Sequence, residues 1–103
     1  MTEILKAIGT PALLEQCAEE CNELAHACLK MARIARGENP TNKNELTAYE
    51  ELVEEAADVE LCLEVLVYGY PLSRSKIEWM KETKRERWKK RIEEQRSLQS
   101  KII

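Results

Sequence analysis

The sequence predicts an all-α fold, in which a helical hairpin and a third long helix form a single domain over residues 1–103. Ala, Leu, Glu, Lys and Arg, which favour helices, dominate the chain, and Phe is absent. Only 3 Gly and 3 Pro are present, too few for the many tight turns of a β-sandwich or barrel. Hydrophobic residues make up 44% and charged residues 34%, which is typical of a globular chain and excludes disorder.

The first core helix is expected over residues 11–36, after a short N-terminal lead, residues 1–10. Thr10 is the predicted N-cap, and Pro11 suits the first helical position because its missing N–H has no partner there. Gly37 marks the end of this helix.

The second core helix is expected over residues 45–68, with Asn44 as its N-cap. It is apolar on nearly every side, since Glu60 and Glu64 are the only charged residues between Val59 and Val67. A helix of this kind is normally buried on most sides, and two other helices of one small chain would cover it poorly. We therefore expect a homo-oligomer, a dimer or a tetramer, assembled as a multi-chain helical bundle.

The third core helix is expected over residues 74–95, capped by Ser73 or by Ser75, which forms a capping-box pattern with Glu78. Charge separates along the chain. Residues 1–73 hold 5 basic and 14 acidic side chains, a net of −9, and the remainder hold 11 basic and 5 acidic, a net of +6. This separation fits either a basic nucleic-acid-binding helix or acidic and basic walls that face one site.

No apolar run approaches the ~20 residues of a membrane span, and the N-terminus lacks the layout of a signal peptide. We therefore expect a cytoplasmic protein without a membrane partner. The cysteines are Cys17, Cys21, Cys28 and Cys62. Because the first three share one helix face and His26 points to the opposite side, core thiols are favoured over a disulfide or a zinc site.

Acidic residues interrupt the apolar stripes of the first two core helices. Glu20 lies within the first stripe with Glu23 on its edge, and Glu55 lies within the second with Asp58 on its flank. An antiparallel hairpin places both pairs at similar height. Four carboxylates this close require a cation, and an all-oxygen set suits Mg²⁺ or Mn²⁺. The alternative is an ordinary solvated face, because glutamate-rich helices are common.

The third core helix carries cations on its inner stripe. Lys84 falls within the stripe and Arg87 lies beside it. They are interpreted either as phosphate-binding groups or as side chains that extend past an apolar surface into solvent. The aromatic residues are read either as base-stacking groups or as core and oligomer contacts: Tyr49, Tyr68, Tyr70, Trp79 and Trp88.

Two segments resemble a known family pattern. Glu19-Glu20-Cys21-Asn22-Glu23, followed by Glu54-Glu55-Ala56-Ala57-Asp58-Val59, resembles the EExxE…ExxD signature of MazG-like nucleoside triphosphate pyrophosphohydrolases. The basic run Lys84–Arg91 is similar to the charged final helix of short members, and the likeness spans roughly residues 11–95. The separation of Glu23 from Glu55 by 31 residues exceeds the usual spacing.

The resemblance implies Mg²⁺-dependent cleavage of a nucleoside triphosphate to monophosphate and pyrophosphate. By this likeness the metal ligands are Glu20, Glu23, Glu55 and Asp58. Glu19 or Glu23 would accept the proton of the attacking water, and Lys84 or Arg87 would offset charge on the pyrophosphate. The alternative function is a non-enzymatic helical adaptor whose basic third helix binds nucleic acid or a protein partner. It accounts for the +6 segment but not for acids inside two core stripes.

Overall fold

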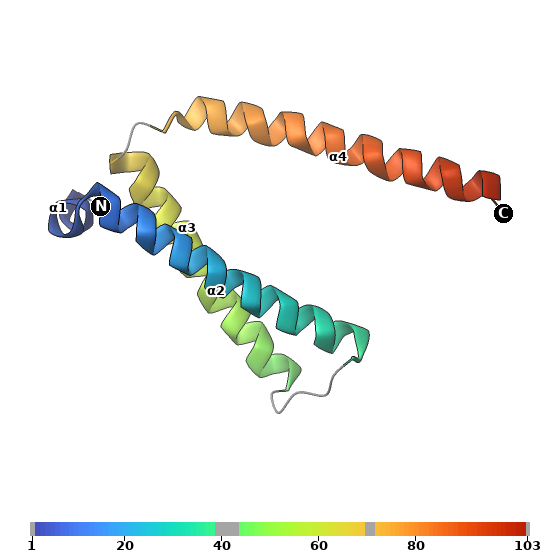
Figure 1. Cartoon of the computed structure of the whole chain (residues 1–103), viewed down its shortest axis with the longest axis horizontal. Helices are drawn as coiled ribbons and strands as arrows, with labels where there is room; N and C mark the ends of the chain where they lie inside the picture. Colours follow the sequence, from blue (N-terminus) through green and yellow to red (C-terminus); the bar gives the residue numbers. More distant parts are fainter. Residues whose placement is uncertain (1, 39–43, 70–71, 103) are drawn as a thin grey trace. The chain divides into compact units, whose positions relative to one another are not determined.

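The structure, a computed structural model, describes residues 2–38, 44–69 and 72–102 (Figure 1). Its elements are all helices, which confirms the predicted all-α class: α1 (Thr2–Ile8), α2 (Thr10–Arg36), α3 (Glu45–Gly69) and α4 (Arg74–Ile102). The chain divides into two compact units, one containing α1 to α3 and the other containing α4. Each unit is described by itself.

The N-terminal lead is helical and turns directly into α2. Gly9, not the predicted Thr10, is the N-cap of α2, and no side chain caps the helix. The N–H of Gly9 donates to the carbonyl of Leu5 at 2.8 Å, and its carbonyl accepts from the N–H of Leu13 at 3.0 Å. Gly9 reaches this junction with φ of 81°, a backbone region that glycine enters without steric cost.

The two ends of the hairpin connection follow the prediction. α2 stops at Gly37, whose left-handed conformation (φ 72°) lets its N–H bond to the carbonyl of Ile34 at 3.1 Å. Asn44 caps α3, because its Oδ1 accepts the N–H of Thr47 at 2.8 Å. Residues 39–43 of the predicted loop lie outside the described residues.

α4 begins where expected and runs further than predicted. Ser73 is the N-cap, since its Oγ accepts the N–H of Lys76 at 3.2 Å, whereas Ser75 lies inside the helix. The predicted end near residue 95 is wrong, because the helix continues to Ile102. Helix-forming residues persist to that point, with neither Gly nor Pro to stop it.

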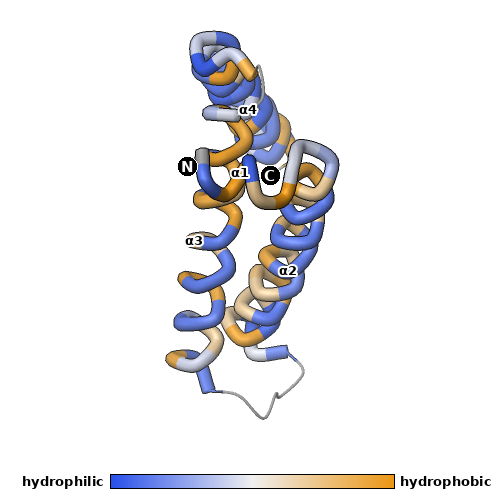
Figure 2. Tube along the Cα trace, turned by 90° about the vertical axis from the view of Figure 1, so that its left-hand side faces the viewer, coloured by the Kyte–Doolittle hydropathy of each residue, from blue (hydrophilic) through white to orange (hydrophobic). Residues whose placement is uncertain are grey.

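α2 and α3 run antiparallel, side by side (Figure 1), and α1 packs against both. The largest buried side chains lie near α1, where Leu13 packs with Val65 and Leu66 and where α3 is most hydrophobic (Figure 2). Gly69 lies at this end of α3 against the side chain of Leu5, and a Cβ at position 69 would collide with it. Further along the hairpin, the buried residues are small: Ala27 and Ala48.

The predicted inner stripes are covered to different extents. On α3 the apolar residues of the predicted stripe are buried or half-buried: Ala48, Leu52, Val59, Cys62 and Leu66. On α2 Cys17 is half-buried, whereas Cys21 and Cys28 are exposed, so their assignment as core thiols is wrong. A single partner helix covers only a narrow face of α2, which leaves residues at the edge of its stripe in solvent. α4 buries none of its side chains.

None of the helices that the structure describes is long and apolar enough to cross a membrane.

Leu13 should contribute more to stability than its neighbour Leu14. Leu13 is 2% exposed and Leu14 is 43% exposed on the same helix. We expect Leu13→Ala to lower the free energy of unfolding by about 2–5 kcal/mol, since it leaves a cavity against α3. Leu14→Ala, the matched control, should change it by less than about 0.5–1 kcal/mol. Urea denaturation followed by circular dichroism measures both, and equal losses would place the core elsewhere.

Candidate metal centre

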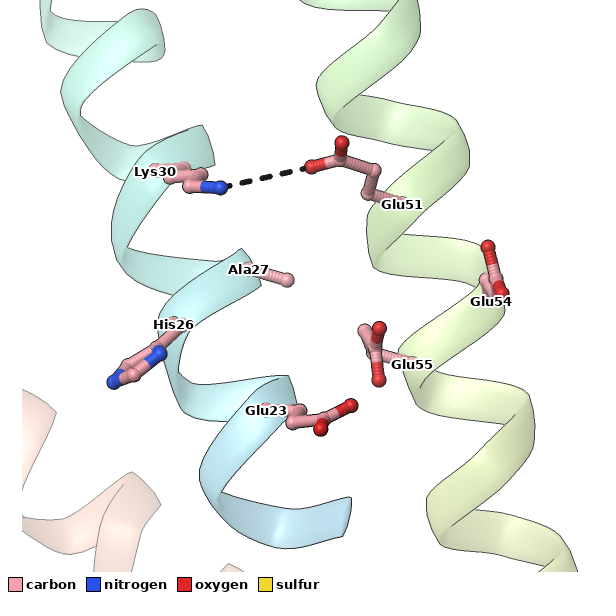
Figure 3. A pocket seen from close by; sticks show the side chains of 7 residues that line it. All are labelled: Glu23, His26, Ala27, Lys30, Glu51, Glu54 and Glu55. Atoms are coloured by element: carbon pink, nitrogen blue, oxygen red, sulfur yellow. Dashed lines mark ion pairs between the residues drawn. The ribbon is translucent and has the colours of Figure 1, made fainter. Parts of the chain in front are cut away.

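Three of the four predicted ligands converge between the hairpin helices. Glu20 and Glu23 come from α2 and lie one turn apart, and Glu55 comes from α3. One carboxylate oxygen of each lies within 4.8 Å of the others. Figure 3 shows Glu23 and Glu55 directed into the space between the two helices. The predicted match in height is therefore correct for these three residues.

Two oxygens of this group lack hydrogen-bond partners. Gln16 donates from Nε2 to Oε1 of Glu20 at 2.7 Å, which satisfies one side of that carboxylate. Oε2 of Glu20 and Oε2 of Glu55 are both buried, and neither finds a partner among the described residues. A buried carboxylate oxygen without a partner is destabilising, so these two atoms need a proton or a cation.

This arrangement raises the pKa of the Glu55 carboxyl. Burial raises its pKa above the usual glutamate range, and the nearby carboxylate of Glu23 adds to the rise. The charges of Asp58 and Glu20 act in the same direction. The group is therefore mutually repulsive in the metal-free protein.

The donor set fits a hard divalent cation. All three converging side chains offer carboxylate oxygens, which Mg²⁺ and Mn²⁺ prefer, and two of those oxygens are buried and unpaired. Asp58, the fourth predicted ligand, is not in the converging group, although it acts on the pKa of Glu55. Glu19 is exposed and also lies outside the group.

Two thiols, Cys17 and Cys62, lie beside the carboxylates. Cys17 donates from Sγ to the backbone carbonyl of Cys62 at 3.6 Å. Burial raises the pKa of Cys62 to about 11, with further contributions from Cys17, Glu20 and Asp58. The environment therefore disfavours the thiolate form of Cys62.

A pocket of about 360 Å³ opens beside the carboxylates. Besides Glu23 and Glu55, its lining includes Lys30, Glu51 and His26. Nζ of Lys30 lies 3.9 Å from Oε2 of Glu51, and the His26 ring is turned away from Glu55 (Figure 3). Lys30 is not among the predicted site residues, although its position seven residues after Glu23 puts both on one face of α2.

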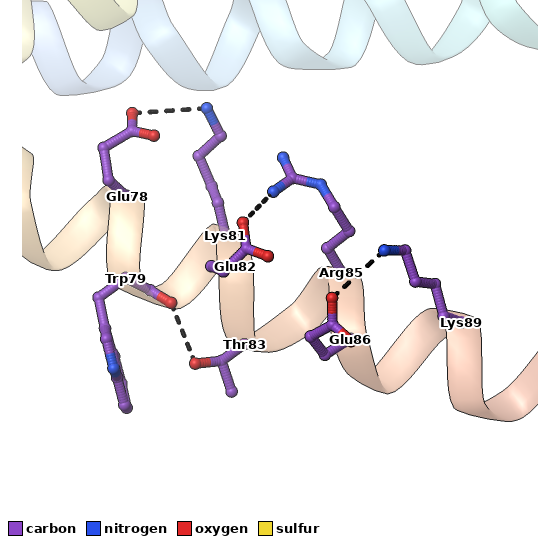
Figure 4. Close-up of polar contacts among 8 residues, drawn as sticks. All are labelled: Glu78, Trp79, Lys81, Glu82, Thr83, Arg85, Glu86 and Lys89. Carbon is purple, nitrogen blue, oxygen red and sulfur yellow. Dashed lines mark hydrogen bonds and ion pairs between the residues drawn. The ribbon is translucent and has the colours of Figure 1, made fainter.

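On α4, the predicted phosphate-binding residues share one surface depression. Lys84 and Arg87 line a depression of about 340 Å³ together with Trp88 and Arg91. Other cations of α4 are engaged in pairs along the helix (Figure 4): Lys81 with Glu78 at 3.5 Å, Lys89 with Glu86 at 3.3 Å, and Arg85 with Glu82. The acidic residues of this stretch are thus neutralised locally, outside the lining of the depression.

Comparisons of this chain with protein-family models, with curated proteins and with solved structures find no match.

Glu55→Gln should stabilise the metal-free protein at neutral pH. Because the pKa of Glu55 is raised in the folded state, folding favours its protonated form. Wild-type stability therefore falls as pH rises from the ordinary glutamate range through that raised pKa. A neutral amide removes this loss. We expect a higher melting temperature than wild type in chelator at pH 7, with the difference shrinking as pH falls.

The same variant should respond less to metal. Mg²⁺ or Mn²⁺ raises the melting temperature of a protein whose folded state alone binds it, and Glu55→Gln removes a ligand. Glu60→Gln, at an exposed position of α3, is the control and should behave as wild type in both conditions. Wild-type melting curves that coincide in metal and in chelator would contradict the metal site.

Proposed function

We propose that this protein is a Mg²⁺-dependent nucleoside triphosphate pyrophosphohydrolase that cleaves a (d)NTP to (d)NMP and pyrophosphate. One observation carries the proposal: three carboxylates converge from two helices at positions of the EExxE…ExxD pattern, and two of them carry a buried oxygen without a partner among the described residues. A purely structural hairpin gains nothing from such a group, because apolar residues there would be less costly.

Glu20, Glu23 and Glu55 would hold the ion. Asp58 lies outside this converging group, although its charge acts on Glu55, and it is proposed as a further ligand from the family pattern alone. A bound Mg²⁺ supplies charge neutralisation at the triphosphate and lowers the pKa of a coordinated water. Glu23 is exposed to solvent within the group, and its proposed second role is to accept the proton of an attacking water. Glu19, outside the group, is the weaker choice for that role.

Cations of α4 are the proposed phosphate-binding groups. Lys84 and Arg87 line one depression, so both can act on a single anion, and Trp88 beside them offers an aromatic face. Their proposed role is to offset charge on the departing pyrophosphate, which forms as the bond to the nucleotide breaks. A role in the nucleotide pool of the cytoplasm belongs to the same proposal.

Self-association through α3 is also part of the proposal. Apolar side chains of α3 that are 46–66% exposed support it: Leu46, Val53, Leu61 and Leu63. A second copy would remove this surface from water. We expect static light scattering to give two or four times the 11.9 kDa of one chain. A monodisperse monomer at micromolar concentration would contradict this.

The adaptor alternative rests on the same depression of α4, because two arginines, a lysine and a tryptophan also suit a nucleic-acid strand. It leaves the converging carboxylates of the hairpin without a purpose. Strong, salt-dependent retention on a DNA column, together with no hydrolysis of any triphosphate, would favour the adaptor.

The decisive experiment is a panel of canonical and modified (d)NTPs with Mg²⁺, with products separated by chromatography. We expect monophosphate and pyrophosphate from at least one substrate. Glu20→Gln, Glu55→Gln and Asp58→Asn should each lower kcat/KM by at least ~10²-fold, the scale of losing an essential electrostatic group. Lys84→Ala should have a smaller effect, partly through KM.

Glu60→Gln is the matched control, since it makes the same change at an exposed position of α3, and its activity should equal wild type. Diphosphate as the main product would overturn the assigned reaction. Carboxylate variants as active as wild type would remove the group from the mechanism.

A further inference from the structure

The carboxylate pocket contains a cation of its own. Lys30 of α2 lines the pocket together with Glu23 and Glu55. By contrast, Arg33, one turn further along α2, is exposed and does not line it. The position of Lys30 is set within the hairpin and needs no contribution from α4.

Lys30 and the carboxylates occupy successive levels of the same groove. Glu23 and Glu55 face each other at one level, and Lys30 faces Glu51 at the next (Figure 3). At about 1.5 Å rise per residue, the levels are separated by about 6 Å along α3 and about 10 Å along α2. Ala27 lies between these two levels on α2 and is 7% exposed. Its methyl group is too short to close the groove.

The ion pair of Lys30 is weak enough to be exchanged for a ligand. Its two charged atoms are 3.9 Å apart, and the side chains of Lys30 and Glu51 are 44% and 33% exposed. Exposed pairs of this length contribute little to stability, and a phosphate group also accepts charge-assisted hydrogen bonds from an ammonium group. Long helical side chains also lean toward the N-terminus of their helix, which for Lys30 is the direction of Glu23.

We propose that Lys30 binds the pyrophosphate portion of the substrate and of the product, as the hairpin's own phosphate-binding residue. The inference rests on the proposed function and adds a residue that the sequence pattern does not identify. A polyphosphate entering this pocket meets the carboxylates Glu23, Glu51, Glu54 and Glu55, and Lys30 supplies positive charge beside them. Pyrophosphate should therefore be an inhibitor whose binding depends on Lys30.

The test uses inorganic pyrophosphate with Mg²⁺, titrated into the full chain by isothermal calorimetry. Lys30→Met keeps the alkyl stem and removes the charge, and we expect it to weaken pyrophosphate binding about tenfold or more. Lys30→Arg should recover most of the affinity. In hydrolysis, Lys30→Met should raise KM and the inhibition constant of pyrophosphate with little change in kcat.

Two control variants separate phosphate binding from a structural role. Arg33→Met makes the same change one turn away and should bind pyrophosphate as wild type does. Glu51→Gln breaks the Lys30 pair but keeps the lysine, so it should not weaken binding. Equal losses in Lys30→Met and Glu51→Gln would show that the pair matters only structurally and would overturn the proposal, as would wild-type affinity in Lys30→Met.

The two proposals fail in different ways. If the protein binds pyrophosphate through Lys30 and hydrolyses no triphosphate, the Lys30 assignment stands and the proposed function falls. If triphosphates are hydrolysed while Lys30→Met leaves KM and pyrophosphate inhibition unchanged, the function stands and the Lys30 assignment is wrong. Absence of pyrophosphate binding in the wild-type protein also overturns it.

Discussion

The repulsion among carboxylates between α2 and α3 is the constraint around which the hairpin is organised. Glu20, Glu23 and Glu55 each place a carboxylate oxygen within 4.8 Å of the others, and Glu20 and Glu55 each carry one buried oxygen without a partner among the described residues. Burial and neighbouring negative charge both raise the pKa of Glu55, so the metal-free state is electrostatically strained. A helix pair that keeps such a group must be held together elsewhere.

The apolar core near α1 provides that support. Leu13, Val65 and Leu66 are packed there, and Leu5 of α1 closes the end of the hairpin against Gly69. Beyond the carboxylates, the buried side chains are the small Ala27 and Ala48. Stability and the carboxylate group are thus separated along one pair of helices. This arrangement is expected where a functional site carries a cost in stability.

The two units of the chain handle charge in different ways. On α4, Glu78, Glu82 and Glu86 are paired with cations three or four residues away, so their charge is compensated within the helix. In the hairpin, acidic side chains outnumber basic ones. Among the described residues, Lys30 is the one lysine that lines the carboxylate pocket. The converging carboxylates of the hairpin therefore favour a cation, while the depression of α4 favours an anionic ligand.

Local chemistry in the sequence determined the helices, most of their ends and the acidic positions on their inner faces. Gly37 and Asn44 act within one turn of the backbone, and a 3.6-residue period is enough to place Glu20 and Glu55 on core-facing stripes. The tertiary structure alone decided which stripe residues are covered. One partner helix leaves Cys21 and Cys28 in solvent and keeps Cys17 half-buried. It also placed Lys30 opposite Glu51, and it packed the N-terminal lead against α3 as α1. The periodicity of the sequence gives the direction in which a side chain points. Whether that side chain is buried or paired depends on how much of the helix its neighbour covers and on which side chains that neighbour presents.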